Sequence, residues 1–183
     1  NQKYMKKIIL SIIILFVFSY PAISHIEHYA DYNYLEYELF RNNKSIGYHK
    51  YDFIREGDTV KVKSEVQFKI TKLGIDLYKY YAESEEVYKK DKFFSFNSKT
   101  NQNKKEKYVN ISTNDKSLVV DGSSFKGETS KNHIIGTWWN HEIVKAKAQI
   151  SAISGRIIEQ KVTFIGKKKL TIGENTFNTL HFN

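Results

Sequence analysis

The chain has 183 residues, a net charge of +9, 40% hydrophobic residues and 15% aromatic residues. This length and composition indicate one domain with a packed core and exclude wholesale disorder. The chain has no cysteine, which excludes disulfides, thiolate metal sites and cysteine nucleophiles. The excess of basic over acidic residues is compatible with binding to nucleic acid, with binding to an anionic membrane surface, or with a role in solubility alone.

The first residues resemble an export signal. Met5-Lys6-Lys7 precedes an apolar run from Ile8 to Tyr20, which ends in Pro21-Ala22-Ile23-Ser24. A charged start, a short apolar run and small residues are typical of a signal peptide, and the run is short for the alternative, a membrane anchor. We predict a signal peptide over residues 1–24, starting at Met5, and one exported β-domain over residues 25–183. With cleavage near Ser24, we expect a periplasmic or secreted protein. Because an exported protein rarely meets nucleic acid, no nucleic-acid partner is predicted.

From Tyr34 onward, apolar and polar residues alternate, as they do in half-buried strands. The pattern predicts strands over residues 34–41, 45–55, 59–70, 75–88, 93–100, 105–113 and 117–121. The strand over 59–70 is the clearest, because valines and Phe68 occupy one face and lysines the other. This pattern is typical of an antiparallel sheet with one covered and one solvated face. A helix over Tyr81–Lys90 is the alternative for the fourth strand, but its aromatic spacing of two favours a strand.

The alternation stops after residue 121. Residues 122–131 are predicted to form a loop, and the spacing over residues 132–144 is helical, although Gly136 limits it to short turns. Strands are predicted again at 146–153, 156–165, 170–172 and 176–182, with a turn at 166–169. The fold class is therefore mostly all-β, an antiparallel meander that forms a curved sheet or partial barrel with one short helical insertion. Because Asn183 falls inside a strand pattern, we predict that the domain is truncated there.

A series of short motifs extends over most of the predicted mature chain. They are Tyr37-Glu38-Leu39-Phe40, Ile46-Gly47-Tyr48-His49, Ser64-Glu65, Leu73-Gly74-Ile75, Tyr78-Lys79-Tyr80, Glu85-Glu86-Val87-Tyr88, Ser98-Lys99-Thr100-Asn101 and Trp138-Trp139-Asn140. In order and spacing they resemble a family of uncharacterised exported bacterial proteins, family number 6134 among the domains of unknown function. The chain departs from the family pattern at Lys104, where glycine is usual. The resemblance implies a secreted or periplasmic β-domain with no assigned activity, similar at fold level to the half-barrels of lipid and lipoprotein carriers.

The segment Gly136–His141 contains both tryptophans of the chain and interrupts the meander. Indole and imidazole rings suit the lining of an apolar cavity, and the sheet adds further aromatic rings. The candidate ligand-binding residues are Trp138, Trp139, His141, Tyr78, Tyr80 and Phe68. The alternative is that the tryptophans only cap the open side of the sheet.

Metal and catalytic patterns are weak in this sequence. His133 and His141 are eight residues apart and match no histidine metal motif, so a metal site would need His49 or His181 as well. No metal and no cofactor are predicted.

A triad of His49, Ser64 and Asp52 can be drawn, but no G-x-S-x-G motif supports it. Glu85 and Glu86 point to opposite faces of a strand and cannot act as a pair. No catalytic residue is therefore assigned.

Three functions remain open from the sequence. The first is a non-catalytic exported domain that binds or shields an apolar or lipid-like molecule in its concave face. The second is an envelope structural or interaction module with a packed core, and the third is a hydrolase built around His49 or His141. The turn lysines at 104–105 and 167–169 add a possible weak contact with an anionic membrane surface.

Overall fold

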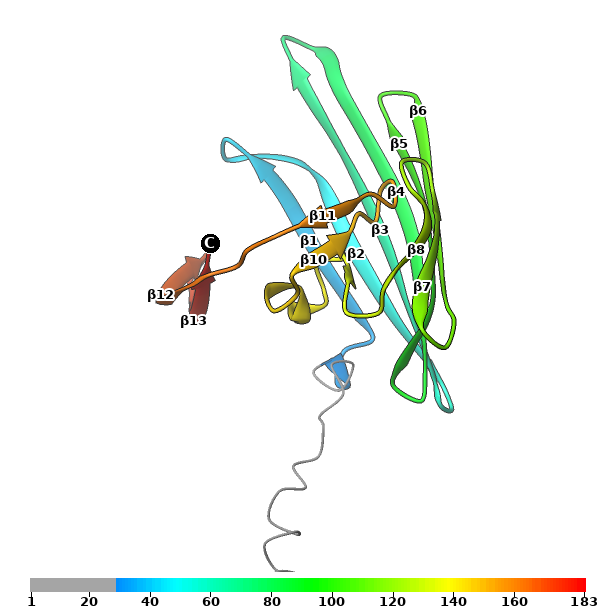
Figure 1. Ribbon diagram of the computed structural model, residues 1–183. Helices are drawn as coiled ribbons and strands as arrows, with labels where there is room; N and C mark the ends of the chain where they lie inside the picture. Colours follow the sequence, from blue (N-terminus) through cyan, green and yellow to red (C-terminus); the bar gives the residue numbers. More distant parts are fainter. Residues whose placement is uncertain (1–28) are drawn as a thin grey trace, which may run out of the picture.

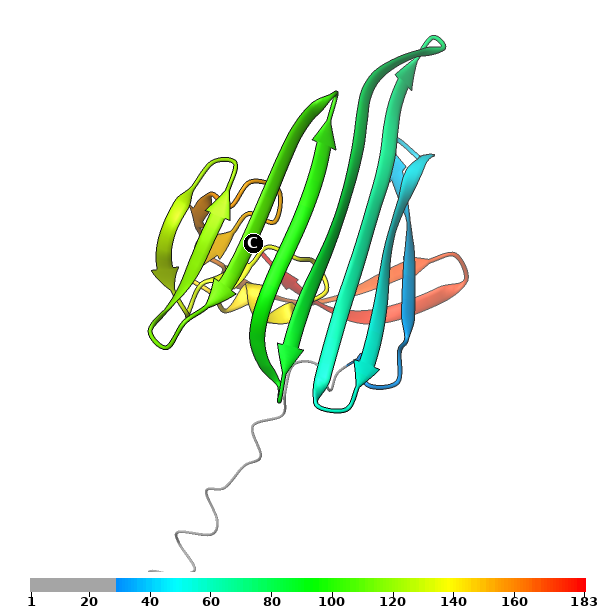
Figure 2. The same cartoon turned by 90° about the vertical axis from the view of Figure 1, so that its right-hand side faces the viewer.

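The computed structural model describes residues 29–183, so the predicted signal peptide lies outside the described residues. Its main feature is an antiparallel sheet in which eight strands follow one another in chain order (Figures 1 and 2). The strands are β1 (Tyr34–Arg41), β2 (Lys44–Glu56), β3 (Thr59–Lys72), β4 (Ile75–Lys89), β5 (Lys92–Gln102), β6 (Lys105–Thr113), β7 (Ser117–Gly122) and β8 (Lys126–Ser130). The first seven match the predicted strands, and the helix considered for residues 81–90 is wrong.

Alternating side chains give the sheet one covered face and one solvated face. Val62 and Phe96 are fully buried, whereas neighbours such as Lys63 and Asn97 on the same strands point to solvent. The sheet curves but does not close into a barrel, since β1 and β8 stay at its two edges. The predicted curved antiparallel sheet is confirmed.

Two-residue turns fix the register of the longest hairpins. Both turn residues have positive φ at Asn42–Asn43, Leu73–Gly74, Lys90–Asp91 and Asn103–Lys104. Such turns match the right-handed twist of paired strands. Lys104 has a φ of 69°, a conformation that glycine adopts at no steric cost.

Residues 131–160, here called the cover segment, cross the covered face. They contain β9 (Ile134–Ile135), the 3₁₀ turn η2 (His141–Val144), β10 (Ala148–Ile150) and β11 (Ile157–Glu159). The small sheet has the order β11-β10-β9, with β9 and β10 parallel. The predicted helical insertion is reduced to one 3₁₀ turn, and the loop predicted over 122–131 is partly wrong because it includes β8.

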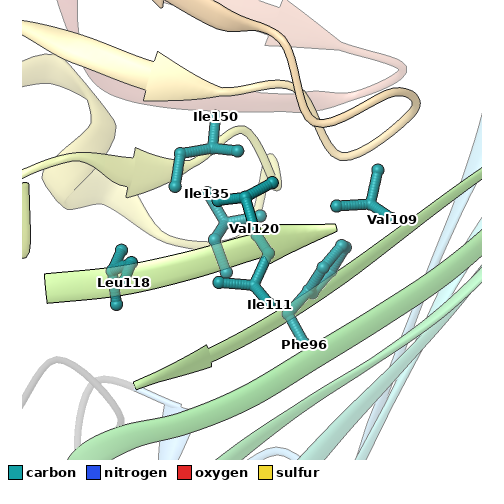
Figure 3. Close-up of a cluster of buried hydrophobic side chains, with 7 residues drawn as sticks. All are labelled: Phe96, Val109, Ile111, Leu118, Val120, Ile135 and Ile150. Atoms are coloured by element: carbon teal, nitrogen blue, oxygen red, sulfur yellow. The ribbon is translucent and has the colours of Figure 1, made fainter. Parts of the chain in front are cut away.

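The core lies between the large sheet and the cover segment. Figure 3 shows the larger cluster, in which Ile135 and Ile150 of the cover segment pack against β5, β6 and β7. Its buried members are Phe96, Val109, Ile111, Leu118, Val120, Ile135 and Ile150. A second cluster joins Trp139 to Tyr51, Phe53 and Val62. Neither cluster includes Phe68 or Tyr80, which pair across β3 and β4 on the same face.

A hairpin of β12 (Phe164–Ile172) and β13 (Asn175–Phe182) follows the cover segment and extends away from the body (Figure 1). The turn predicted at residues 166–169 is wrong, because the chain turns at Gly173–Glu174 instead. Gly166 sits at a register shift within β12, and Lys168 and Lys169 pair with Thr179 and Asn178. Cross-strand pairing here overrides the turn preference of a Gly-Lys-Lys-Lys sequence.

Candidate functional site

A groove of about 530 Å³ lies between β1–β5 and the cover segment. The sheet contributes an apolar wall that includes Leu39, Val66, Phe68 and Ala82. The cover segment contributes Trp138 and the stretch 151–153 on the other side. A groove of this size, with a mostly apolar wall, is within the range of small-molecule sites in proteins.

Four of the six predicted ligand-binding residues line this groove: Phe68, Tyr78, Tyr80 and Trp138. The Phe68 ring stacks on Tyr80, with centroids 4.9 Å apart, and on Tyr78, with centroids 5.9 Å apart. The cross-strand pairs Phe68–Tyr80 and Ile70–Tyr78 place these rings on one face. Trp138 is 81% exposed, so its indole stands at the mouth of the groove with its surface available.

The other two predicted residues lie elsewhere. Trp139 is 4% exposed and belongs to the second core cluster, where Tyr29, Phe53 and Tyr88 meet its ring edge to face. It serves as the cap that the sequence left open as an alternative. His141 lies at the start of η2, with its Nε2 3.4 Å from a Glu142 carboxylate oxygen, and does not line the groove.

Glu86 anchors the cover segment to the sheet. Its carboxylate is 3% exposed and accepts hydrogen bonds from Trp139 Nε1 at 3.0 Å, from Thr137 Oγ1 at 3.2 Å and from the Tyr88 hydroxyl. Burial raises the pKa of Glu86, and the three donors lower it in part. Sequence reasoning did not find this role, because two of the donors lie more than fifty residues further along the chain.

The sheet brings His49 and Ser64 together on the groove wall. His49 Nε2 lies 2.9 Å from Ser64 Oγ, and the Tyr51 hydroxyl lies 3.4 Å from His49 Nδ1. Burial lowers the pKa of His49 to about 4, so the imidazole is neutral near pH 7 and a weak base. Asp52 alternates with Tyr51 and lines a hollow on the opposite face, so the triad drawn from the sequence does not form.

Hydroxyl groups cross the groove wall in a row. The register aligns Ser64, Ser84 and Ser98 on β3, β4 and β5, with Thr100 two residues beyond Ser98. Ser98 Oγ donates to the Ala152 carbonyl oxygen at 2.6 Å and so ties the sheet to the cover segment. Thr100 is 1% exposed, so its hydroxyl is enclosed by the groove wall. It lies beside the phenol of Tyr80, whose pKa is raised by burial and lowered in part by this hydroxyl.

The groove is almost uncharged. Its lining includes no lysine and no arginine within the described chain, and its one carboxylate residue is Glu83. Glu83 accepts a hydrogen bond from the Tyr81 hydroxyl at 3.1 Å and also lines the hollow on the solvated face. Thr100 and Ser84 were not predicted as site residues, although their period-2 spacing places them on the covered face.

The hollow on the solvated face is of a different kind. It measures about 600 Å³ and is lined by charged and amide side chains. Lys63 and Glu85 form an ion pair of 3.8 Å there, and Lys99 lies directly opposite Glu83 in the register of β4 and β5. Opposite charges of this kind are typical of a solvated sheet face. Within residues 29–183, no three histidine or acidic residues gather as a metal site would require.

These features define an all-β protein whose open antiparallel sheet holds a partly covered, weakly polar groove on one face. The chain belongs to the family described as domain of unknown function (DUF6134), which it matches over residues 37–183. No curated protein and no solved structure matches the chain. Among residues 29–183, no helix has the length and hydropathy needed to cross a lipid bilayer.

Proposed function

We propose that the protein binds an apolar small molecule in the groove between β1–β5 and the cover segment. The single observation that carries this proposal is the stacked wall of Phe68, Tyr78 and Tyr80, which lines the same groove of about 530 Å³ as the exposed Trp138. Burying this apolar surface within the protein would stabilise the fold, so an apolar surface that stays exposed is typical of a binding site. The signal-like segment at residues 5–24 supports an exported location for this role.

The chemistry of the groove favours a neutral ligand with a hydroxyl or carbonyl group. Thr100 and Ser84 supply hydroxyls to the lining, and Ser64 adds a third beside neutral His49. A buried anion needs a cation or several donors to offset its lost hydration. Since the lining has no lysine or arginine, the ligand class is a long-chain alcohol, acylglycerol or similar neutral molecule.

Native mass spectrometry of the purified protein tests the proposal first, by measuring any apolar molecule bound to it. Titration with 1-decanol and with decanoate, which share one alkyl chain, then tests the ligand class through tryptophan fluorescence. Trp138 is exposed at the groove and Trp139 is buried in the core, so the ligand-dependent part of the emission comes from Trp138. We expect decanol to bind at least about tenfold more tightly than decanoate, because the decanoate carboxylate would be left without a cation in this groove.

Two variants complete the test. Trp138→Ala is expected to weaken decanol binding, measured by calorimetry, without loss of stability, because exposed side chains contribute little to folding. Phe94→Ala is the control, since Phe94 is also exposed, at 45%, but does not line the groove. Absence of any bound molecule together with no decanol binding would contradict the proposal and favour an envelope structural or interaction module. Equal binding of decanoate would contradict only the ligand class.

A further inference from the structure

The strand ends on one side of the large sheet combine basic and apolar residues. In a meander every second turn lies at the same end of the strands, so the turns of the hairpins β1–β2, β3–β4 and β5–β6 lie on the same side. Figures 1 and 2 show these three ends, blue to green, at the top of the sheet, where the β3–β4 hairpin reaches furthest. We call residues 41–44, 69–79 and 104–107 the hairpin edge.

The hairpin edge is strongly basic. It has eight basic residues and two acidic residues, Asp76 and Glu106. The basic residues are Arg41, Lys44, Lys69, Lys72, Lys79, Lys104, Lys105 and Lys107. Asp76 is paired with Lys79 at 3.0 Å, and the Glu106 carboxylate accepts a hydrogen bond from Asn101. Most of the lysines at this edge therefore have no acidic partner within residues 29–183.

The opposite edge provides an internal comparison. Its hairpin ends are residues 55–61, 89–92 and 115–116, with six basic and four acidic residues. Its charges are therefore closer to balance, and the large exposed hydrophobic residue nearest to the range 89–92 is Phe94, two residues beyond it. The basic excess and the apolar residues described next are thus features of one edge and not of the sheet in general.

The tip of the β3–β4 hairpin is apolar and exposed. Leu73 is 93% exposed, Ile75 is 66% exposed and Leu77 is 55% exposed. Phe40, at the end of the neighbouring hairpin, is 60% exposed. Exposing apolar side chains to water at a projecting tip is unfavourable, and their transfer into an apolar phase is favourable.

Leu73 is also strained. Its φ is 50°, in the left-handed region that asparagine and glycine adopt and branched apolar residues avoid. The equivalent turn in the first hairpin uses asparagine at this conformation, with Asn42 at 51°. A leucine at this position is therefore less favourable than asparagine, both for the turn and for hydration.

We propose that the hairpin edge docks on an anionic lipid bilayer, with Leu73 and Ile75 entering the interface and the surrounding lysines contacting lipid phosphates. Basic side chains around an apolar insertion match the charge and the polarity gradient of such a surface. Phe68, Tyr78 and Tyr80 of the groove belong to the same part of β3 and β4, so a docked protein holds its groove near the bilayer. The docking itself does not depend on the groove having a ligand.

Co-sedimentation with vesicles tests this inference. We expect the full chain to bind vesicles of phosphatidylcholine and phosphatidylglycerol in a three-to-one ratio, to bind pure phosphatidylcholine vesicles much less, and to lose binding as salt is raised. Lys72→Glu with Lys104→Glu is expected to weaken binding about tenfold or more. Lys90→Glu with Lys92→Glu makes the same charge change at the opposite edge and is expected to leave binding nearly unchanged.

Leu73→Asn separates membrane insertion from folding. Asparagine is suited to the positive φ of the turn, so this variant is expected to fold at least as stably as the parent while binding vesicles several-fold more weakly. Equal loss from both charge pairs, undiminished binding by Leu73→Asn, or no binding to the phosphatidylglycerol vesicles would each overturn the inference. These outcomes are independent of decanol binding, so failure here leaves the proposed function of the groove in place.

Discussion

His49 is held neutral by the groove wall, and this gives the folded protein a specific pH dependence. Burial lowers its pKa from 6.5 to about 4. Between these two values the unfolded chain binds a proton at His49 that the folded chain does not bind. The contribution to stability is therefore fully present above pH 6.5 and is lost as the pH falls towards 4. Allowing for partial exposure, we expect a loss of about 1–2 kcal/mol.

The prediction is measured by denaturant unfolding at about pH 7 and about pH 4.5, comparing the parent with His49→Gln. The variant should lose less stability on acidification, because glutamine does not titrate. The raised pKa of Glu86 acts in the opposite direction, stabilising the fold at low pH. That effect is common to both proteins and cancels in the comparison. Identical pH dependence in both would show that His49 is solvated in the folded state.

At the residue scale, the sequence predicted the position of a side chain when its neighbours are close in sequence, and not when they come from distant segments. Phe68, Tyr78 and Tyr80 were found because strand alternation and hairpin pairing determine their shared face. Glu86 was missed because nothing in its own strand distinguishes a buried carboxylate from a solvated one. Its environment is set by Thr137 and Trp139, which approach only after the cover segment has crossed the sheet.

The cover segment depends on a close approach of two backbones at Gly122. A Cβ atom at this position would lie 2.6 Å from the Ser154 carbonyl oxygen and 3.0 Å from Gly155 Cα. Nearby, the Ser124 N–H donates to the Ser154 carbonyl oxygen at 2.8 Å. An alanine at position 122 would therefore push this part of the cover segment away from the sheet.

We expect Gly122→Ala to lower the free energy of unfolding by about 1–3 kcal/mol, as overpacking does, and to speed hydrogen exchange at the Ser124 amide. Gly57→Ala is the matched control. Gly57 lies in an open turn with a φ of 57° and no atom near its Cβ position, so its cost is confined to local backbone strain. Unchanged exchange at Ser124 in Gly122→Ala would show that the two backbones are further apart in solution.

Long elements were predictable from the sequence and short ones were not. The first seven strands have their own alternation and turn residues, so local preference and pairing agree. Ile134–Ile135 and Ala148–Ile150 are too short to show a period, and their parallel pairing joins segments separated by the η2 turn. Their strand geometry is a product of packing Ile135 and Ile150 against β5–β7.

At the scale of the whole molecule, the sequence predicted one continuous meander, whereas the described chain forms three separate sheets. The difference arises after β8, from residue 131 onward, where the chain crosses the large sheet and then leaves it. The hairpin β12–β13 pairs only within itself and has no extensive contact with any other described strand. Its apolar side chains Leu170, Ile172 and Phe177 are exposed. It therefore lacks the packing that stabilises the body.

This arrangement predicts two levels of stability in one chain. An isolated two-stranded hairpin is marginal in water, while strands buried in a core open only with global unfolding. In native-state hydrogen exchange, amides of β12 and β13 should therefore exchange first and with little dependence on denaturant. Amides of β3, β5 and β6, beside Val62, Phe96 and Ile111, should exchange last. Hairpin amides as well protected as those of β5 would contradict this prediction. The hairpin would then have to be held by a contact outside the fold of residues 29–183, such as a second copy of the chain. In that case protection would rise with protein concentration.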